Sequence, residues 1–180
     1  APLGDSVPAS LNDFEGFRVA LYPQRGGRAP EFDVEENFRV MGRCLARMHN
    51  VGGTGKFEHR PAISVRSFGV ESVEFVTPRF IPDDLRPAYE TLTADLLRLC
   101  EERFAVCNEI RYIRVHGDCH IGNVLWRDDA PNFVDFDDAR MAPAIQDLWM
   151  LVSGSQAEQQ RQLGKILEGY GEFSDFDFQE

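Results

Sequence analysis

The sequence predicts an α+β fold in which a mainly helical domain surrounds one short β-hairpin. Apolar residues recur every three or four positions over several stretches, and two short apolar runs flank an Asp-rich turn near residue 129. The chain has 180 residues, of which 43% are hydrophobic and 27% charged, a composition typical of an ordinary globular protein of one domain or a little more.

The first thirty residues differ in character from those that follow. Residues 1–15 are rich in Pro, Ser and Asp, which indicates a loop or a hairpin arm. Phe17–Tyr22 predicts a strand, which ends at Pro23 and the turn residues Gly26–Gly27. We therefore divide the chain into residues 1–30 and a helical domain of residues 31–180.

A strongly periodic helix opens this domain. Asp33 is suited to cap its N-terminus, with Glu36 as the return partner of a capping box. The apolar face of the helix comprises Val34, Phe38, Met41, Leu45 and Met48. Gly52–Gly53 ends it.

The middle of the chain is less regular than its ends. Residues 60–82 contain several breakers and predict extended chain. Pro87 suits the first turn of a second helix. Its apolar stripe comprises Tyr89, Leu92, Leu96 and Leu99. Two more helices are expected at Ala144–Ser153 and Gln156–Tyr170.

The remaining predicted strands lie between the second and third predicted helices. Arg111–Val115 predicts a short strand that leads into a polar loop. Val124–Trp126 and Phe133–Val134 predict a tight hairpin with its turn at residues 128–131. The two aspartates of that turn are explained by turn chemistry alone.

Charge and composition exclude several classes of partner. The formal net charge of −11 argues against a nucleic-acid surface, which would show a basic patch. The longest apolar run, Leu148–Val152, is far below the roughly 18–20 residues of a membrane span. Four cysteines at irregular spacings favour reduced thiols. We therefore expect a cytoplasmic protein.

Asp118 and Asn123 are the first candidates for chemistry. Residues 119–122 separate them, which is the spacing of the kinase catalytic loop, where the Asp accepts the substrate hydroxyl proton and the Asn holds magnesium. A base and a metal ligand must converge on one phosphoryl group, and a short loop keeps them close. Asp118 is therefore the predicted catalytic base.

Asp135 completes this set. Asn123 precedes one hairpin strand and Asp135 follows the other, so the hairpin places them almost opposite, at a Cα separation of about 4.5–5.5 Å. An amide oxygen and a carboxylate suit Mg²⁺ and leave positions for the phosphate oxygens of ATP. We predict Asn123 and Asp135 as magnesium ligands and assign Asp135 a catalytic role as well.

The same stretch contains an alternative metal site. His116, Cys119 and His120 have the residue types of a zinc cluster. A structural zinc site needs a second ligand pair, and the chain offers only His49, His59 and isolated cysteines. We prefer to assign His116 and His120 to support of the loop, the latter by hydrogen bonding.

The motifs also carry a family resemblance. His116–Asn123 with Asp135–Asp138 resembles the aminoglycoside phosphotransferase and choline kinase superfamily. The similarity extends over Val115–His120, Asn123–Asp128, Val134–Arg140 and Pro143–Leu151, and Pro61–Ile63 and Glu172–Ser174 fit as well. It covers nearly the whole chain.

The resemblance implies a protein kinase-like fold of the aminoglycoside phosphotransferase type, mostly its helical C-terminal lobe. Residues 1–30 would be a remnant of the N-terminal lobe with the hinge, and residues 31–180 a truncated C-terminal catalytic lobe. It assigns Asp118 as base and Asn123 with Asp135 as magnesium ligands.

The resemblance also implies an adenine site and a brace for the loop. Leu21 and Tyr22 would contact adenine at the hinge, and Leu125 would form the floor of the pocket. Without the resemblance, core packing is the preferred explanation for these three residues. Asp147, at the start of a helix, would brace the catalytic loop.

Some parts of a complete kinase are missing from the sequence. A glycine-rich loop, a strand lysine and a helix glutamate should precede the hinge, whereas the first lysine is Lys56 and Gly26–Gly27 is not such a loop. A fragment is therefore expected. Gly117 replaces the Arg that reads an activation-loop phosphate, and residues 136–146 are too few for a long activation segment. Regulation by activation-loop phosphorylation is not expected.

The implied activity is transfer of the ATP γ-phosphate to Ser or Thr hydroxyls of a protein, the enzyme itself included, by a monomer. One alternative is a small-molecule kinase acting on an aminoglycoside, choline or a homoserine-like alcohol. Another is an inactive kinase-like fragment. The catalytic loop alone does not separate these readings, because both kinds of kinase need the same base and metal.

Overall fold

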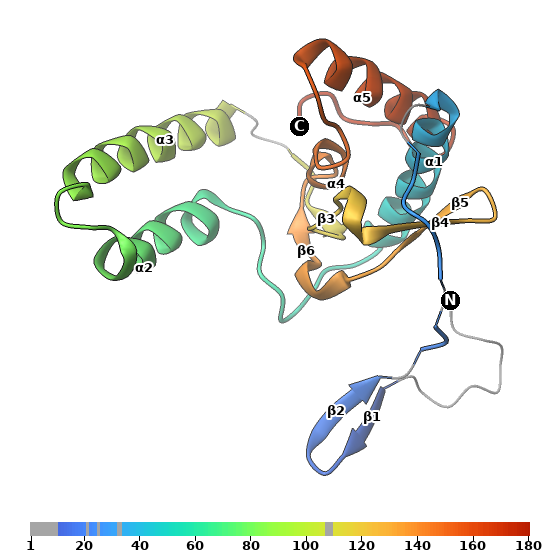
Figure 1. Cartoon of the computed structure of the whole chain (residues 1–180), viewed down its shortest axis with the longest axis horizontal. Helices are drawn as coiled ribbons and strands as arrows, with labels where there is room; N and C mark the ends of the chain where they lie inside the picture. Colours follow the sequence, from blue (N-terminus) through green and yellow to red (C-terminus); the bar gives the residue numbers. More distant parts are fainter. Residues whose placement is uncertain (1–10, 21, 25, 32–33, 107–109) are drawn as a thin grey trace.

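The computed structural model describes residues 12–180 fully and the backbone of residue 11, apart from residues 21, 25, 32–33 and 107–109 (Figure 1). The elements follow in the order β1 (Leu11–Phe14), β2 (Phe17–Ala20), α1 (Glu35–Gly52), α2 (Glu71–Phe80), α3 (Arg86–Val106), β3 (Ile113–Val115), β4 (Val124–Arg127), β5 (Ala130–Phe133), β6 (Arg140–Ala142), α4 (Ile145–Trp149) and α5 (Gln156–Tyr170).

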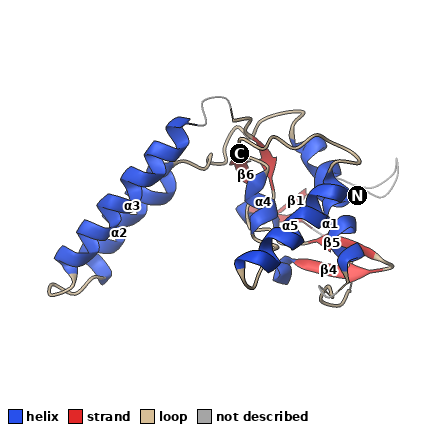
Figure 2. Ribbon diagram, turned by 90° about the horizontal axis from the view of Figure 1, so that it is seen from above, coloured by secondary structure: helices blue, strands red, loops and turns tan. Residues whose placement is uncertain are grey.

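The elements form three parts. Helices α1, α4 and α5 with strands β3 to β6 make a compact unit, which we call the body (Figure 1). Helices α2 and α3 run side by side and project from it, and we call them the arm (Figure 2). Strands β1 and β2 pair as a separate antiparallel hairpin. None of the described helices combines the length and apolar character needed to cross a membrane.

The core of the body lies between α1 and α5. The two helices approach closely at Gly42 and Gly169, because a Cβ on either would lie about 2 Å from a backbone oxygen of the other helix. The predicted apolar face of α1 is largely confirmed. Its buried members are Phe38, Met41 and Leu45. The predicted cap Asp33 lies outside the described residues, and Val34 occupies the N-cap position without a side-chain bond.

The predicted hairpin is confirmed as β4 and β5, which pair antiparallel from Val124–Phe133 to Arg127–Ala130. Asp128 and Asp129 both have positive φ angles, as a two-residue type I′ turn requires. Val124 and Trp126 are buried in the core, so Leu125 between them faces the other side of the hairpin. The pairing of β3 with β6 was not predicted.

The expectation of extended chain over residues 60–82 is wrong for most of this stretch, which is helical from residue 65 to residue 80, whereas Ala62 makes a β-bridge with Met141. A π-helical turn at Arg66–Val70 leads directly into α2. Val73, Val76 and Thr77 are the half-buried side chains of α2 and recur at helical spacing. Pro78 lies inside α2, two residues before the helix ends at Phe80.

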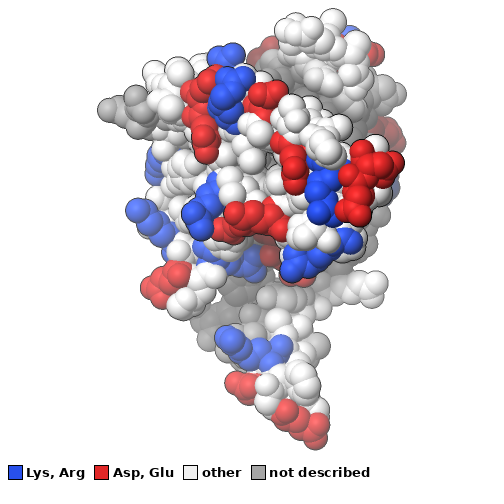
Figure 3. Space-filling model, turned by 90° about the vertical axis from the view of Figure 1, so that its left-hand side faces the viewer, with Lys and Arg blue, Asp and Glu red and all other residues white. Residues whose placement is uncertain are grey.

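Helix α3 confirms the predicted helix, with Pro87 in its first turn, but its apolar stripe is not in a core. Leu92, Leu96 and Leu99 are 58%, 50% and 45% exposed. The less exposed face of α3 carries Tyr89, which belongs to the predicted stripe, together with Thr93 and Leu97, which do not. Seen from the side where the arm projects, acidic and basic side chains are interspersed among uncharged ones (Figure 3).

Other boundaries shift modestly. Strand β2 ends at Ala20, before the predicted Tyr22. Helix α4 is shorter than expected because it ends at Trp149, whereas α5 spans the predicted residues. Ser155 and Glu158 form a capping box at the start of α5.

Candidate active site

The loop from His116 to Asn123 connects β3 to β4, and the buried carboxylate of Asp147 holds its beginning. The backbone N–H groups of His116 and Gly117 donate to the two oxygens of Asp147 at 2.8 and 2.9 Å. Gln146 adds a bond to the Gly117 carbonyl oxygen at 3.1 Å. The start of α4 therefore fixes the start of the loop.

Gly117 shows why no side chain fits beside Asp118. Its φ is +89°, and a Cβ there would lie 2.2 Å from the backbone oxygen of Asp138. The absence of an arginine at this position thus has a steric cause in this fold.

His116 joins the loop to the hairpin. Its ring is fully buried, and Nε2 donates to the Val134 carbonyl oxygen at 2.8 Å. Because a carbonyl only accepts, the neutral ring has its hydrogen on Nε2, and Nδ1 accepts from the Asp118 N–H at 3.4 Å. One imidazole therefore ties the backbone of Asp118 to the residue preceding Asp135.

Neighbouring side chains restrain the carboxylate of Asp118. The Asn123 amide donates to the Asp118 backbone oxygen at 2.9 Å and to Oδ2 at 3.2 Å. His120 Nε2 lies 3.5 Å from the same Oδ2, while its Nδ1 accepts from the Gly122 N–H at 2.9 Å. Among the described residues no donor engages Oδ1, and the Asp118 side chain is 35% exposed. This arrangement leaves one carboxylate oxygen able to accept a proton.

Asn123 and Asp135 lie on adjoining chain segments. The Val134 N–H donates to the Asn123 carbonyl oxygen at 3.0 Å, which places Asp135 one residue beyond the partner of Asn123. Asp135 is exposed and has a left-handed backbone (φ 64°). No bond or ion pair from the described residues engages its carboxylate.

These two residues fit a magnesium ion by the chemistry of their donors. The nitrogen of the Asn123 amide is committed to Asp118, so its oxygen remains for a cation beside the unengaged carboxylate. The described residues contain no cluster of three or more His, Cys, Asp or Glu arranged for a metal. A structural zinc site at the loop therefore gains no support.

Cys119 is buried directly beside Asp118. Burial raises the pKa of its thiol far above the usual range, and the carboxylates of Asp147 and Asp118 raise it further. The thiol stays protonated at neutral pH and is unsuited to act as a nucleophile.

The residues predicted to contact adenine are not brought together as Asp118, Asn123 and Asp135 are. Leu21 lies outside the described residues, and Tyr22 is 74% exposed. Leu125 is half-buried, and Arg28 pairs with its neighbour Trp126 through two backbone bonds.

His49 and Tyr170 are two buried polar residues that the sequence did not single out for the site. His49 of α1 contacts Asp147 at 3.0 Å and Tyr170 of α5 at 3.1 Å. A signal was present, because His49 follows Leu45 at helical spacing and thus lies on the apolar face of its helix.

Sequence comparison agrees with this geometry. The chain matches the phosphotransferase enzyme family over residues 1–180. It is 43% identical over 178 residues to stress response kinase A of Escherichia coli O157:H7, which covers 98% of this chain and 53% of that protein. The serine/threonine protein kinase RdoA of Salmonella typhimurium strain LT2 is 42% identical over 164 residues, with 91% and 49% coverage. The chain thus spans about half the length of these relatives.

Solved structures share the fold at low identity. Spectinomycin phosphotransferase APH(9)-Ia, in complex with ADP and spectinomycin, has a TM-score of 0.62 at 18% identity over 94% of this chain and 57% of that one. Amicoumacin kinase hAmiN has a TM-score of 0.61 at 19% identity over 89% and 50%.

The predicted resemblance and the kinase-like fold are therefore confirmed, together with the mixed, mainly helical class. Because the family match covers residues 1–180 and a relative is 43% identical over 178 residues, the chain belongs to the phosphotransferase enzyme family.

Proposed function

We propose that this chain carries the catalytic site of an ATP- and magnesium-dependent kinase that phosphorylates Ser or Thr hydroxyls of a protein. The observation that carries the proposal is the arrangement around Asn123, whose amide holds one oxygen of Asp118 and leaves the other unengaged, and whose backbone pairs with Val134, the residue before Asp135. The name of one relative at 42% identity, serine/threonine protein kinase RdoA, supports a protein substrate.

In the proposed reaction the Asp118 Oδ1 accepts the proton of the substrate hydroxyl. The hydroxyl oxygen forms a bond to the γ-phosphorus of ATP as the bond from that phosphorus to the β,γ-bridging oxygen breaks, and ADP leaves with the electron pair. The bond from Asn123 to Oδ2 orients the carboxylate before substrate arrives, so less ordering is needed during reaction.

Asn123 and Asp135 would hold the magnesium ion, which when bound supplies positive charge to the phosphate oxygens. His116, His120 and Asp147 would support the loop through the contacts described above.

The remaining assignments follow the same proposal. Leu21, Tyr22 and Leu125 would contact adenine, Leu125 from the side of the hairpin opposite the core. We further propose that the protein is a monomer of the cytoplasm. A role in a stress response is proposed from the name of the relative stress response kinase A. Residues 1–30 would be the remnant of the N-terminal lobe with the hinge, and residues 31–180 the truncated C-terminal lobe.

Phosphate transfer from labelled ATP tests the activity. The 180-residue chain and the longest polypeptide that its gene encodes are each incubated with a generic protein substrate and with a panel of amino alcohols. Label on Ser or Thr of protein, including the enzyme itself, is the expected result. Label confined to an amino alcohol would instead establish a small-molecule kinase, and no label from the longest polypeptide would refute the proposal.

Calorimetry tests the metal site. In the presence of ATP, Asp135→Asn should weaken magnesium binding, because it removes the formal charge from this ligand pair. Asp129→Asn, in the hairpin turn, is the matched control and should bind as the wild type does. Equal affinity in Asp135→Asn and the wild type would refute the assignment.

A further inference from the structure

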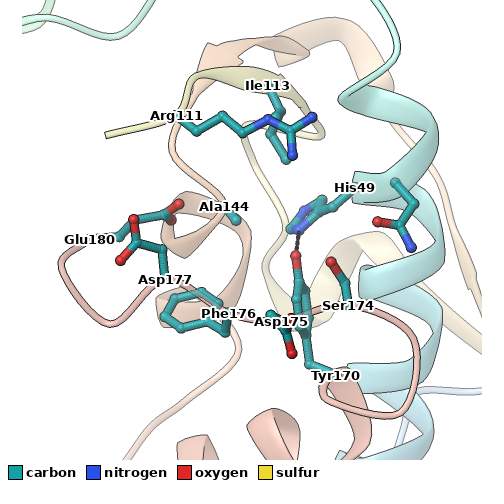
Figure 4. A pocket seen from close by; sticks show the side chains of 11 residues that line it. His49, Arg111, Ile113, Ala144, Tyr170, Ser174, Asp175, Phe176, Asp177 and Glu180 are labelled. Carbon is teal, nitrogen blue, oxygen red and sulfur yellow. Dashed lines mark hydrogen bonds between the residues drawn. The ribbon is translucent and has the colours of Figure 1, made fainter. Parts of the chain in front are cut away.

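A buried polar network reaches the catalytic loop from two helices that carry none of the assigned catalytic residues. His49 Nε2 of α1 lies 3.0 Å from Asp147 Oδ2, and His49 Nδ1 lies 3.1 Å from the hydroxyl of Tyr170 in α5. Figure 4 shows the imidazole of His49 and the phenol of Tyr170 pointing toward each other. Both side chains line a cavity of about 180 Å³. His49 and Tyr170 are each 3% exposed and Asp147 is fully buried.

The partners fix the direction of these hydrogen bonds. An ionised carboxylate has no hydrogen to give, so His49 Nε2–H donates to Asp147. In the neutral ring Nδ1 then accepts, and the donor is the Tyr170 hydroxyl. Burial raises the pKa of Tyr170 to about 12, so this hydroxyl keeps its hydrogen at neutral pH. The bonds therefore run from Tyr170 through His49 to Asp147.

Asp147 is the point where this network meets the loop. Its Oδ2 accepts from both His49 and the His116 N–H, and its Oδ1 accepts from the Gly117 N–H. The two loop bonds are short only in one orientation of the carboxylate plane. Among the described residues, His49 is the side chain that also bonds this carboxylate and so restrains its rotation.

A change in the position of Asp147 would affect both Asp118 and the chain that leads into Asp135. The His116 ring binds the Asp118 N–H on one nitrogen and the Val134 oxygen on the other. Movement of the His116 backbone would therefore shift the proposed base relative to the chain that leads into Asp135.

We propose that His49 and Tyr170 are positioning residues that hold Asp147, and through it the catalytic loop, in the geometry for phosphoryl transfer. This role rests on the proposed function for its catalytic consequence. The structural part of it, restraint of the loop amides by Tyr170 and His49, is measurable without any activity.

Site-resolved amide hydrogen exchange in the 180-residue chain is the direct test. Tyr170→Phe removes one hydroxyl and keeps the ring that packs edge-on against Phe176. Because a buried acceptor or donor loses its partner, exchange of the His116 and Gly117 amides should accelerate about 5- to 100-fold. The Leu45 amide in the α1 core should change much less. Tyr112→Phe removes a hydroxyl from another partly buried tyrosine outside the network and should leave the loop amides unchanged.

A second pair of variants at His49 checks the inner bond. His49→Gln retains a side-chain N–H for Asp147 and should keep the loop amides slow, whereas His49→Phe should release them further than Tyr170→Phe does. Unchanged exchange at His116 and Gly117 in Tyr170→Phe would overturn the proposal. An equal acceleration at Leu45 would do the same, because it would show general loss of stability.

Kinetics of the longest encoded polypeptide add the catalytic readout. Tyr170→Phe should lower kcat several-fold with the KM for ATP unchanged, since the network contacts the loop and not the nucleotide, and His49→Gln should retain more of the activity than His49→Phe. A change confined to KM would overturn the catalytic part. If the wild type transfers no phosphate, the proposed function fails, while the exchange data still decide whether these residues restrain the loop.

Discussion

The body and the arm are both built from periodic helices, yet they use their apolar residues in opposite ways. In the body, α1 buries Met41 and Leu45 completely against α5. In the arm, neither α2 nor α3 has a fully buried residue over its described length. The exposed large apolar side chains of the arm are Phe75, Phe80, Leu92, Leu96, Leu99, Phe104 and Val106.

The comparison separates helix formation from burial. A stripe at three- and four-residue spacing predicts a helix because it matches the helical period, but only a facing element converts that stripe into a core. The body supplies such an element, and its interior also holds the buried polar network around Asp147. The site should therefore depend on the body, and changes in the arm should have small effects on it.

The largest difference between substitutions in the body and in the arm is expected in catalytic turnover. In the longest encoded polypeptide, Asp118→Ala should reduce turnover about 10²- to 10⁴-fold, the usual contribution of a general base, with ATP affinity nearly intact. Asp84→Ala removes an exposed carboxylate between the arm helices and should leave turnover unchanged. One kinetic series measures both. An effect of Asp118→Ala below about tenfold would point to another carboxylate, such as Asp137 or Asp138, as the base.

Stability should show the same contrast. Leu45→Ala removes a fully buried side chain and should lower the free energy of unfolding by about 2–5 kcal/mol. Leu92→Ala removes one that is 58% exposed and should change it by about 0.5 kcal/mol or less. Chemical denaturation followed by circular dichroism measures both. Equal losses would mean that the arm face is covered in solution.

Two glycines sharpen the comparison within the body. Gly117→Ala should destabilise the fold by about 1–3 kcal/mol, since alanine is strained at this positive φ and its Cβ meets the Asp138 oxygen. Gly164→Ala, on the open face of α5, should stabilise it by up to about 1 kcal/mol through better helix propensity. Thermal melts of the two variants should shift in opposite directions, and parallel shifts would contradict the described loop.

The smallest effect on stability concerns the arm surface. Replacing Leu92, Leu96 and Leu99 together by Gln should reduce binding of a hydrophobic dye and leave the free energy of unfolding within about 0.5 kcal/mol of the wild type. A matched triple change at Glu90, Arg98 and Glu101 to Gln should keep the dye signal. Unchanged dye binding in the leucine variant would show that the arm face is not accessible.

Much of the fold was predictable because its signals are local. The period of α1, the capping box of α5 and the turn at Asp128–Asp129 each follow from neighbouring residues. The pairing of β3 with β6 was not predictable in the same way, because those strands meet only after the intervening chain has folded. Residues 60–82 were misread because the breakers in this stretch indicated extended chain, whereas one of them, Pro78, lies inside α2.

The candidate site likewise contains residues with a local sequence signal and residues that meet only through long-range contacts. The spacing of Asp118, Asn123 and Asp135 in the sequence pointed to chemistry, since their types match one reaction at one spacing. His49 contacts Asp147 and Tyr170 contacts His49 from positions far away in the chain, so these contacts depend on how α1 and α5 pack. Long-range contacts of this kind are absent from any local pattern.

The burial of Cys119 has a practical consequence for following the molecule in solution. A folded loop shields this thiol from alkylating reagents, whereas Cys100 on the arm is exposed and Cys44 is half-buried. Timed alkylation with peptide mapping would then read three depths of the structure in one experiment. The rate at Cys119 would report how often the region beside Asp118 opens, and the rate at Cys100 would set the scale for an unprotected thiol.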